Sequence, residues 1–400
     1  MKIPSLAACA ALTFGAFTYA GDCNDPDGRA LELVRSYPLI DTHVDVPYRI
    51  HEKWADVTQS TADGEFDYPR AQAGGLDIPF MSIYTPPELE ATGGAFQLAN
   101  ELIDSVEALV GRAPDRFMLV YSPAEAQAAF EQGRIGLALG MENGSPIEGK
   151  LENVAYFAKR GIRYITLAHS LSNHISDSSF DTARPNGGLS DFGREVVREM
   201  NRQGVMVDLS HLSDEAIHDV LEVSAAPVIA SHSSARTLTP GFERNISDEL
   251  IQGVAAGGGV VMINFGSSFI TPEANAYLVR ILAERKAYLA EHGFAAGGPE
   301  EKAWTEAFRV ENPVPFASLA QVADHFDHVI SLVGADHVGI GSDFDGVGDT
   351  LPIGLKDVSQ YPNLVAEFLR RGYDEEDIAG ILGGNLLRVW RAVEAHAAGR

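Results

Sequence analysis

Cysteine is scarce in this chain, whose 400 residues include only Cys9 and Cys23. A small domain held together by disulfides is therefore excluded. Cations are scarce as well, because 30 lysines and arginines stand against 56 aspartates and glutamates, which gives a formal net charge of −26. A surface this negative repels phosphate groups, so nucleic-acid binding and attachment to anionic membranes are disfavoured.

Long hydrophobic runs are also missing beyond the first twenty residues, so no later segment is long enough to span a bilayer. No G-x-G-x-x-G pattern follows the first apolar run, which weakens a dinucleotide-binding interpretation. What is present is ordinary globular composition, with 45% hydrophobic and 22% charged residues. Disorder is therefore excluded for the bulk of the chain, which has ample apolar material for a core.

Residues 1–20, MKIPSLAACAALTFGAFTYA, combine one lysine, a short apolar run and small residues at the end. This pattern predicts a secretory signal peptide, so we expect a secreted or periplasmic protein whose mature part is a single domain over residues 21–400. A lipoprotein signal around Cys9 is the alternative. Cleavage after Ala20 would leave Cys23 as the lone cysteine, free or linked to another chain.

Eight short apolar runs recur along the rest of the chain, each bounded by Gly, Pro or Asp. They cover Leu39–Ile40 with the DTHVD that follows, 78–84, 135–142, 162–169, 205–211, 227–232, 259–265 and 337–345. Each is too short for a buried helix and is typical of a strand buried on both faces. Helical periodicity lies between most of them, with the clearest stretches at 95–110, 190–203, 213–224, 246–256 and 318–333.

Alternating strands and helices predict parallel pairing through right-handed crossovers. Eight such units closing on themselves form a (β/α)8 TIM barrel, an α/β fold; a doubly wound open sheet is the structural alternative. Residues 266–316 are predicted to be an insertion between the seventh and eighth strands. The centre of the insertion, 273–292, is helical in pattern and is broken by Gly297-Gly298-Pro299.

Residues able to bind a metal stand at the ends of six of these strands. They are His43 and Asp45, Glu142, His169, His211, His232, and Asp343 with Asp345. The C-terminal ends of barrel strands are where active sites lie, because the βα loops converge there. Buried carboxylates and imidazoles need partners, and a metal would satisfy most of them together.

Five of these residues are candidate metal ligands, which is too many for one catalytic zinc ion, because such an ion keeps three protein ligands and an open position. They are His43, Asp45, Glu142, His211 and His232. A carboxylate can bridge two ions, so we expect two divalent cations that share Glu142 and a hydroxide. Mixed histidine and carboxylate ligands suit zinc, with manganese, cobalt or iron as alternatives.

Seven motifs occur in the order and approximate spacing of the renal-type (membrane) dipeptidases, which are binuclear zinc peptidases of the amidohydrolase superfamily. The motifs are DTHVD, GMENG, TLAHS, DLSH, SHSSA, ERN and GSDFDG, and the similarity runs from about Asp41 to about Val393. The chain resembles that family over most of its length. The resemblance does not include the membrane anchor of the family's animal members, so membrane attachment is not expected from it.

The resemblance implies hydrolysis of free dipeptides, with His43 and Asp45 on the first zinc, His211 and His232 on the second, and Glu142 bridging. It further implies substrate-binding roles for three residues. His169 would contact the scissile carbonyl, Arg244 would bind the terminal carboxylate, and Asp343 would engage the free amino end and carry the proton. Arg236 is the alternative to Arg244, because the family often has two basic residues before the asparagine. The family also suggests a homodimer.

Two other functions stay open at the level of sequence. One is a different binuclear amidohydrolase, either carboxypeptidase-like or a lactam and cyclic-amide hydrolase. The other is a noncatalytic protein that binds peptides or zinc. The complete set of candidate residues argues against the second. Side-chain preference, stereochemistry and the native metal are not readable from the sequence.

Overall fold

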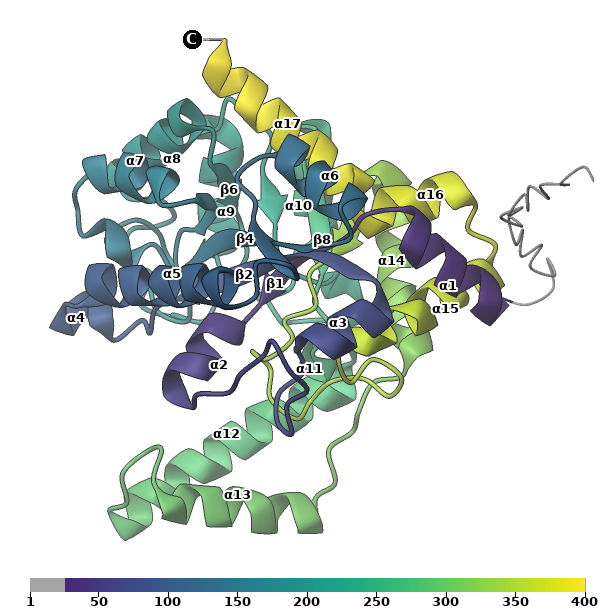
Figure 1. The fold of residues 1–400 in the computed structure, drawn as a ribbon. Coiled ribbons are helices and arrows are strands. Elements are labelled where there is room, and N and C mark those ends of the chain that lie inside the picture. The colour runs from purple at the N-terminus through teal and green to yellow at the C-terminus, as the bar shows by residue number, and fades with distance from the viewer. Residues whose placement is uncertain (1–25, 400) are drawn as a thin grey trace, which may run out of the picture.

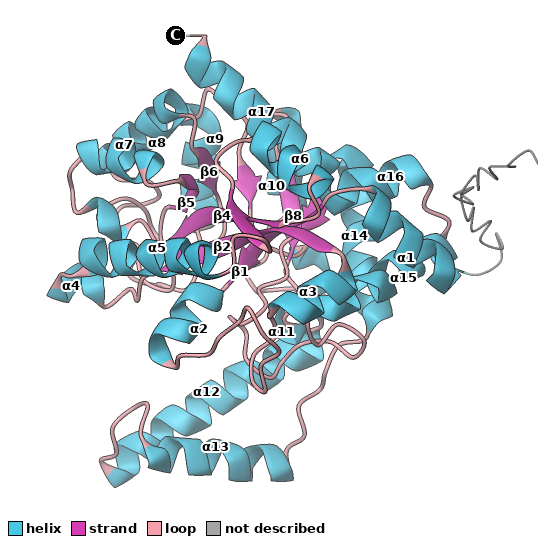
Figure 2. Cartoon of the chain, in the orientation of Figure 1, coloured by secondary structure: helices cyan, strands magenta, loops and turns pink. Residues whose placement is uncertain are grey.

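All eight apolar runs form strands in the computed structural model, which describes residues 26–399. The strands are β1 (Leu39–Val44), β2 (Leu76–Tyr84), β4 (Ile135–Glu142), β5 (Ile162–Thr166), β6 (Met206–Asp208), β7 (Ile229–Ala230), β8 (Val260–Ile263) and β9 (Val338–Ile340). They lie at the centre of the molecule with helices around them (Figures 1 and 2). The predicted (β/α)8 barrel is confirmed.

The strands pair in parallel in the order β1-β2-β4-β5-β6-β7-β8-β9. Their register aligns the carboxyl ends, because Tyr84 pairs with Glu142, Glu142 with Thr166, and Thr166 with Asp208. The last strand returns to the first through a parallel bridge between Val44 and Phe344. This register brings the residues that follow each strand to one end of the barrel.

The structure also contains a ninth strand that the sequence pattern did not predict. It is β3 (Phe117–Leu119), which pairs in parallel with β4 outside the main strand order. Three residues are too few to establish a hydrophobic period, so β3 could not be distinguished from a loop by pattern.

The five predicted helices are confirmed as α5 (Ala95–Arg112), α8 (Asp191–Gln203), α9 (Asp214–Val223), α10 (Asp248–Ala256) and α14 (Leu319–Val333). Three of them begin at a Ser-Asp pair: the hydroxyls of Ser190, Ser213 and Ser247 accept a hydrogen bond from a backbone N–H of the first turn. The aspartate that follows each serine lies where the helix dipole favours negative charge. Local sequence therefore fixes where these crossover helices start.

The remaining elements complete the outer layer and the loops. The helices are α1 (Pro26–Ser36), α2 (Val46–Glu52), α3 (Tyr68–Gly74), α4 (Leu89–Thr92), α6 (Pro123–Glu131), α7 (Glu152–Lys159), α15 (Tyr361–Arg371), α16 (Glu375–Ala379) and α17 (Asn385–Ala398). The short turns are η1 (Ser145–Ile147), η2 (Arg236–Leu238), η3 (Ala335–His337), η4 (Val358–Gln360) and the π-helical η5 (Gly380–Gly384).

The inside of the barrel is filled by side chains, and α17 covers its amino-terminal end. Ile40, Ile78 and Phe80 from the first two strands pack with Trp390 and Val393 of α17 in one buried cluster. The Phe80 and Trp390 rings lie 5.4 Å apart. Because this end is closed by apolar packing, only the carboxyl end of the barrel is open for chemistry.

The predicted insertion after β8 consists of α11 (Ser267–Ile270), α12 (Pro272–His292) and α13 (Pro299–Glu311). Figure 1 shows α12 and α13 as a hairpin that extends away from the barrel. The prediction of a helix over 273–292 is confirmed, and Gly297-Gly298-Pro299 separates it from α13 as expected. The sequence pattern did not predict α13, which buries only Phe308 fully.

The predicted signal peptide and Cys23 lie in residues 1–25, outside the described residues. Within residues 26–399, no helix is both long enough and apolar enough to cross a membrane.

A partly buried carboxylate at the closed end of the barrel makes stability depend on pH. Asp77 accepts a hydrogen bond from the Leu39 N–H at 2.9 Å, and burial raises the pKa of its carboxyl from 3.8 to about 7. Because the folded state holds this proton more tightly than the unfolded state, the contribution of Asp77 is greatest below pH 4 and is lost as pH rises through 7.

Asp77→Asn should therefore stabilise the protein at pH 8 by roughly 2–4 kcal/mol, because asparagine keeps the acceptor for Leu39 without the buried charge. Denaturant unfolding of the metal-free wild type and variant between about pH 5 and 8 measures this difference. The gap between the two curves should widen as pH rises. Parallel curves would show that the carboxylate is solvated well enough to ionise freely.

Candidate metal centre

The residues predicted from the strand ends meet at the carboxyl end of the barrel. His43 ends β1, Glu142 ends β4, and the others stand in the loops that follow β1, β5, β6, β7 and β9. A cavity of about 560 Å³ opens on them. Its lining includes Asp45, Glu142, His169, His211 and Asp343.

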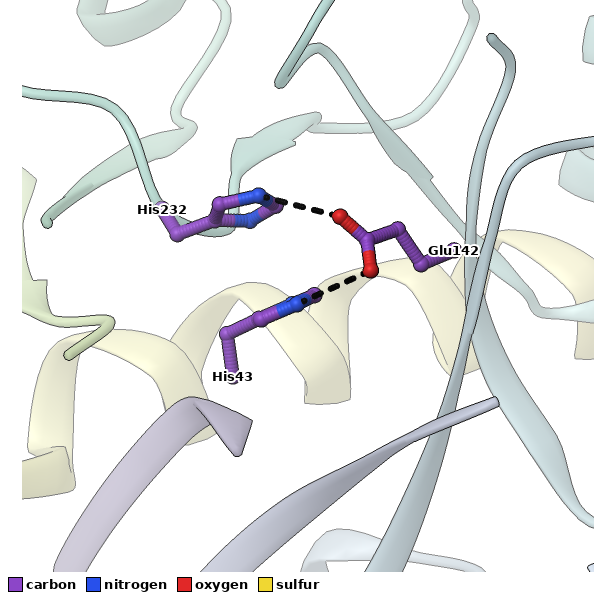
Figure 3. A group of neighbouring side chains, drawn as sticks. All are labelled: His43, Glu142 and His232. Carbon is purple, nitrogen blue, oxygen red and sulfur yellow. Dashed lines mark ion pairs between the residues drawn. The ribbon is translucent and has the colours of Figure 1, made fainter. Parts of the chain in front are cut away.

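Glu142 lies at the centre of this group. Its Oε1 atom is 3.1 Å from Nε2 of His211 and 3.4 Å from Nε2 of both His169 and His232. Its Oε2 atom is 3.3 Å from Nε2 of His43, which in turn is 3.4 Å from Asp45 Oδ2. Figure 3 shows the carboxylate with one oxygen toward His232 and the other toward His43. One carboxylate thus faces imidazoles from four different strand ends.

Three overlapping groups of side chains have their ligand atoms close enough to share an ion. They are His43, Glu142 and His232; Glu142, His169 and His211; and His43, Asp45 and Asp343. Glu142 belongs to two of the groups and His43 to two. This arrangement suits two ions with a shared carboxylate better than one isolated ion.

The charge states of the histidines also fit a cation. Burial and the nearby positive charge of Arg244 hold the pKa of His211 well below its usual range, and burial and neighbouring positive charge do the same for His232. Both imidazoles are therefore neutral, which is the form that binds metals. Nε2 of His43 is buried and has no hydrogen-bond partner. Burial lowers the pKa of His43, but Tyr164 and the carboxylates of Glu142 and Asp45 hold it well above its usual range, so the position between these carboxylates attracts a positive charge, either a proton or a metal ion.

Asp343 is buried beside this cluster with its carboxylate held in place. The side-chain amide of Asn264 donates to Asp343 Oδ2 at 2.7 Å, and the Asp343 N–H donates to the His43 carbonyl at 3.1 Å. Burial raises the pKa of Asp343 from 3.8 to about 7. Gly346 leaves space for it, because a Cβ at Gly346 would lie 2.3 Å from both Asp343 Oδ1 and Asp45 Oδ2.

Of the six non-glycine residues with left-handed backbone in residues 26–399, four are candidate site residues or directly adjoin one. Their φ angles are 79° for Asn143, 71° for His211, 65° for Asp343 and 67° for Asp345. Asparagine and aspartate tolerate this region better than most residues, and such strain is concentrated at functional sites. Asp345 is fixed by reciprocal bonds with Glu65, since each carboxylate accepts the other residue's N–H, at 2.6 and 2.7 Å.

Arg244 and Arg236, the two arginines considered for binding a terminal carboxylate, differ in their hydrogen-bond partners. Arg244 is 3% exposed and donates to Ser233 Oγ at 2.8 Å, but its Nε and one terminal nitrogen have no partner. Burial lowers the pKa of its guanidinium to about 10, which leaves it charged at neutral pH. Arg236 instead forms a paired contact with Asp214 at 2.5 and 2.6 Å. Arg244 is the one with donors left for a ligand.

Aromatic rings form part of the cavity wall. Tyr84 packs 4.9 Å from the His169 ring and edge-on to Tyr48, and Phe269 lies under the Arg244 guanidinium at 5.2 Å. Phe180 lines the cavity and is 46% exposed. Apolar walls around a few polar groups are typical of a small-molecule site.

Sequence reasoning missed two residues that hold the cluster from the remaining strands. Ser82 of β2 donates to Glu142 Oε2 at 3.1 Å, and Asn264, just after β8, holds Asp343. Both lie toward the carboxyl ends of strands from which no site residue had been chosen. Their position near these strand ends was the one signal in the sequence that could have identified them as site residues. Serine and asparagine are too common for residue type to identify them.

Residues 28–400 match the model of the family described as membrane dipeptidase, peptidase family M19. An uncharacterized dipeptidase of Schizosaccharomyces pombe is 31% identical over 404 residues, which cover 96% of this chain and 88% of that protein.

Solved structures share the fold. A probable dipeptidase, PvdM, from Pseudomonas aeruginosa is 28% identical with a TM-score of 0.80, covering 93% of this chain and 99% of that one. A metallopeptidase from Rhodobacter sphaeroides, liganded with a phosphinate mimic of the dipeptide L-Ala-D-Ala, is 25% identical with a TM-score of 0.72. That match covers 89% of this chain and 99% of the other.

Proposed function

The chain belongs to the membrane dipeptidase family, peptidase family M19, and on that premise we propose that it is a zinc-dependent dipeptidase that hydrolyses free dipeptides. One observation carries the proposal. A buried arginine with unpaired donors lies at the same barrel mouth as four imidazoles gathered around one carboxylate. The imidazoles around one carboxylate are what a metal-activated hydrolase needs, and the arginine with unpaired donors is what recognition of a terminal carboxylate needs.

In this proposal His43 and Asp45 would hold one zinc ion, His211 and His232 would hold the other, and Glu142 would be a ligand shared by both. Mixed imidazole and carboxylate donors at buried positions support zinc as the metal. When bound, such a pair supplies Lewis-acid activation of water and of the scissile carbonyl group.

The chain's own residues place the substrate and move the proton. Arg244 binds the terminal carboxylate with its free N–H groups, which sets the distance from that carboxylate to the bond that breaks. His169 donates a hydrogen bond to the carbonyl oxygen and stabilises its developing charge. Asp343 accepts the proton of the attacking water and delivers it to the leaving amine. The hydrogen bond from Asn264 holds the Asp343 carboxylate while it does so.

Residues 1–20 act as a secretory leader in this proposal, so the mature enzyme would work outside the cytoplasm. The amino-acid pattern of those residues is what supports it.

A panel of dipeptides tests the proposal directly. The zinc-loaded protein should cleave free dipeptides and lose that activity in a chelator. N-acetylated dipeptides, dipeptide amides and tripeptides serve as controls, because each lacks one of the two correctly spaced termini. Cleavage of blocked or longer substrates would point to another amidohydrolase, and two bound metals without turnover would point to a binding protein.

Arg244→Lys should raise KM for a free dipeptide by roughly 10–100-fold, because a lysine cannot make the paired contact of a guanidinium with a carboxylate. Steady-state kinetics on the zinc-loaded variant measures the change. Arg236→Lys is the matched control, since Arg236 donates to Asp214 and to the carbonyls of Glu243 and Asn245, so its KM should stay near the wild-type value. An unchanged KM in Arg244→Lys would remove Arg244 from carboxylate binding.

A further inference from the structure

In two of the four clustered histidines, Nδ1 lies within hydrogen-bond distance of a hydroxyl group. Nδ1 of His43 is 2.9 Å from the phenolic oxygen of Tyr164, and that phenol donates to the Thr42 carbonyl at 2.9 Å. A carbonyl can only accept, so the phenolic hydrogen is committed to Thr42. The hydrogen between His43 and Tyr164 must then belong to Nδ1 of His43, so that Nε2 is the nitrogen whose lone pair is free when the ring is neutral.

The second hydroxyl is that of Ser231, which repeats the arrangement for His232. Nδ1 of His232 is 2.7 Å from Ser231 Oγ, and Ser231 Oγ donates to Asp208 Oδ2 at 2.6 Å. Asp208 is fully buried and accepts from two backbone N–H groups, those of Ser210 and Ser231, at 3.1 and 2.7 Å. The hydroxyl of Thr166 also donates to it. Because an ionised carboxylate only accepts, His232 must donate from Nδ1.

The other two histidines lack such a contact. Nδ1 of His169 and of His211 is buried and has no hydrogen-bond partner. The hydroxyl contacts are therefore specific to His43 and His232, the pair whose rings stack with their centroids 3.8 Å apart and both face Glu142. Figure 3 shows these two rings with the carboxylate that both face.

We propose that Tyr164 and the Ser231–Asp208 pair are positioning residues, which hold hydrogen on Nδ1 of His43 and His232 and so direct the Nε2 lone pairs toward the metals. The inference rests on the proposed function, because it concerns the ligands of that same site. A hydrogen bond to the ring nitrogen opposite the metal fixes both the tautomer and the ring orientation. Asp208 adds negative charge behind His232, which strengthens that imidazole as a donor to a cation.

The packing around Tyr164 provides an independent reason to assign it this role. Its ring is fully buried against Phe80, with centroids 5.6 Å apart. A Cβ at Gly140 would lie 2.0 Å from Tyr164 Cζ, so only glycine at that position leaves room for the phenol. Gly140 stands two residues before Glu142 on β4. The strand that supplies the central carboxylate thus also makes space for the group that orients His43.

A purely structural tyrosine is the competing explanation. The Thr42 carbonyl alone would satisfy a buried phenol, so its loss would then lower stability without changing the affinity for metal. Tyr164→Phe and Ser231→Ala separate the two explanations, because each removes one hydroxyl and leaves every metal ligand in place. Asp208→Asn keeps the shape behind Ser231 and removes the charge.

The experiment titrates each folded, metal-free protein with zinc against a chromophoric chelator and records cobalt absorption spectra in parallel. Tyr164→Phe, Ser231→Ala and Asp208→Asn should each weaken binding of at least one metal equivalent by about 10–100-fold. The cobalt spectrum should change as well, because the ligand geometry relaxes. Ser234→Ala and Tyr373→Phe are matched controls, as their hydroxyls are bonded to the Asn264 carbonyl and to Asp327 and contact no imidazole.

Affinities of Tyr164→Phe and Ser231→Ala within about twofold of wild type would overturn the inference while leaving the proposed function intact. Failure of the wild type to bind zinc would instead overturn the proposed function. Proton–nitrogen NMR of the metal-free wild type, labelled at histidine, tests the hydrogen placement without any metal. Nδ1 atoms of His43 and His232 without hydrogen in that spectrum would refute the positioning role.

Discussion

Asp343→Asn should lower kcat for a free dipeptide by about 10³–10⁴-fold while the zinc content stays at two ions per chain. The reason is that an amide cannot accept the proton of the attacking water or deliver it to the leaving amine. The carboxylate is already held for that task by Asn264 at 2.7 Å and lies beside Asp45 in the cavity. KM should change much less than kcat, because Arg244 still binds the terminal carboxylate.

Asparagine is the informative replacement because of the backbone at this position. Asp343 has a φ angle of 65°, a left-handed conformation that asparagine tolerates and alanine adopts at a cost of about 1–2 kcal/mol. Asp343→Ala would therefore combine loss of the proton carrier with a strained turn. If both variants had the same low kcat and only Asp343→Ala had a lower melting temperature, the loss of activity would be due to the missing proton carrier and not to impaired folding.

Asp345→Asn is the matched control, because Asp345 has nearly the same backbone angle and lies two residues further along the same loop. Its carboxylate contacts the Glu65 N–H and Arg49 rather than the metal cluster. That variant should keep its metals and most of its turnover. If Asp343→Asn lost one zinc ion, Asp343 would be a ligand, as its proximity to His43 and Asp45 allows.

The sequence was sufficient to predict the barrel and the approximate place of the site for a simple geometric reason. Parallel strands that follow helices all run in the same direction, so whatever follows each strand collects at one end. His43, Glu142, His211 and His232 each end or follow an apolar run, and the structure brings the three imidazoles within 3.1–3.4 Å of the Glu142 carboxylate. No knowledge of the strand register was required.

The supporting residues could not be predicted because their roles depend on register and side-chain packing. Tyr164 lies inside the apolar strand β5 and has the pattern of a core residue, and only the folded barrel shows that β1, which does not pair with β5, places His43 against its hydroxyl. Asn264 serves Asp343 only because β8 and β9 are neighbours. Likewise, the choice between Arg244 and Arg236 depends on Asp214, which occupies Arg236 from another loop.

Glu142→Gln should reduce the zinc content from two ions to one or fewer and lower turnover by more than about 10³-fold. Glu142 is the single carboxylate that faces all four imidazoles, with Ser82 donating to its Oε2 atom at 3.1 Å. Glutamine fits the same space but lacks the negative charge. Its amide nitrogen also cannot accept, so at most one of the two metal positions would keep an oxygen ligand from residue 142.

The stability of the protein toward unfolding gives a measurement that does not depend on turnover. A ligand that binds only the folded state stabilises it by about 2.7 kcal/mol when its free concentration is a hundred times Kd. Zinc should therefore raise the free energy of unfolding of the wild type much more than that of Glu142→Gln. Burial raises the pKa of the Glu142 carboxyl, but the positive charges of His43 and His169 outweigh burial and hold that pKa well below its usual range. In the metal-free proteins, Glu142→Gln should therefore be destabilising, because the pairing of this ionised carboxylate with the imidazoles is lost.

Glu90→Gln is the control for this experiment, since Glu90 also contacts a histidine, His174, at 2.8 Å but lies outside the cluster. That variant should keep two zinc ions, near-normal turnover and the full stabilisation by zinc. If Glu142→Gln did the same, the bridging role would be wrong. The four imidazoles would then have to hold the metals with Asp45 and Asp343 alone, and the second ion would have no carboxylate ligand from β4.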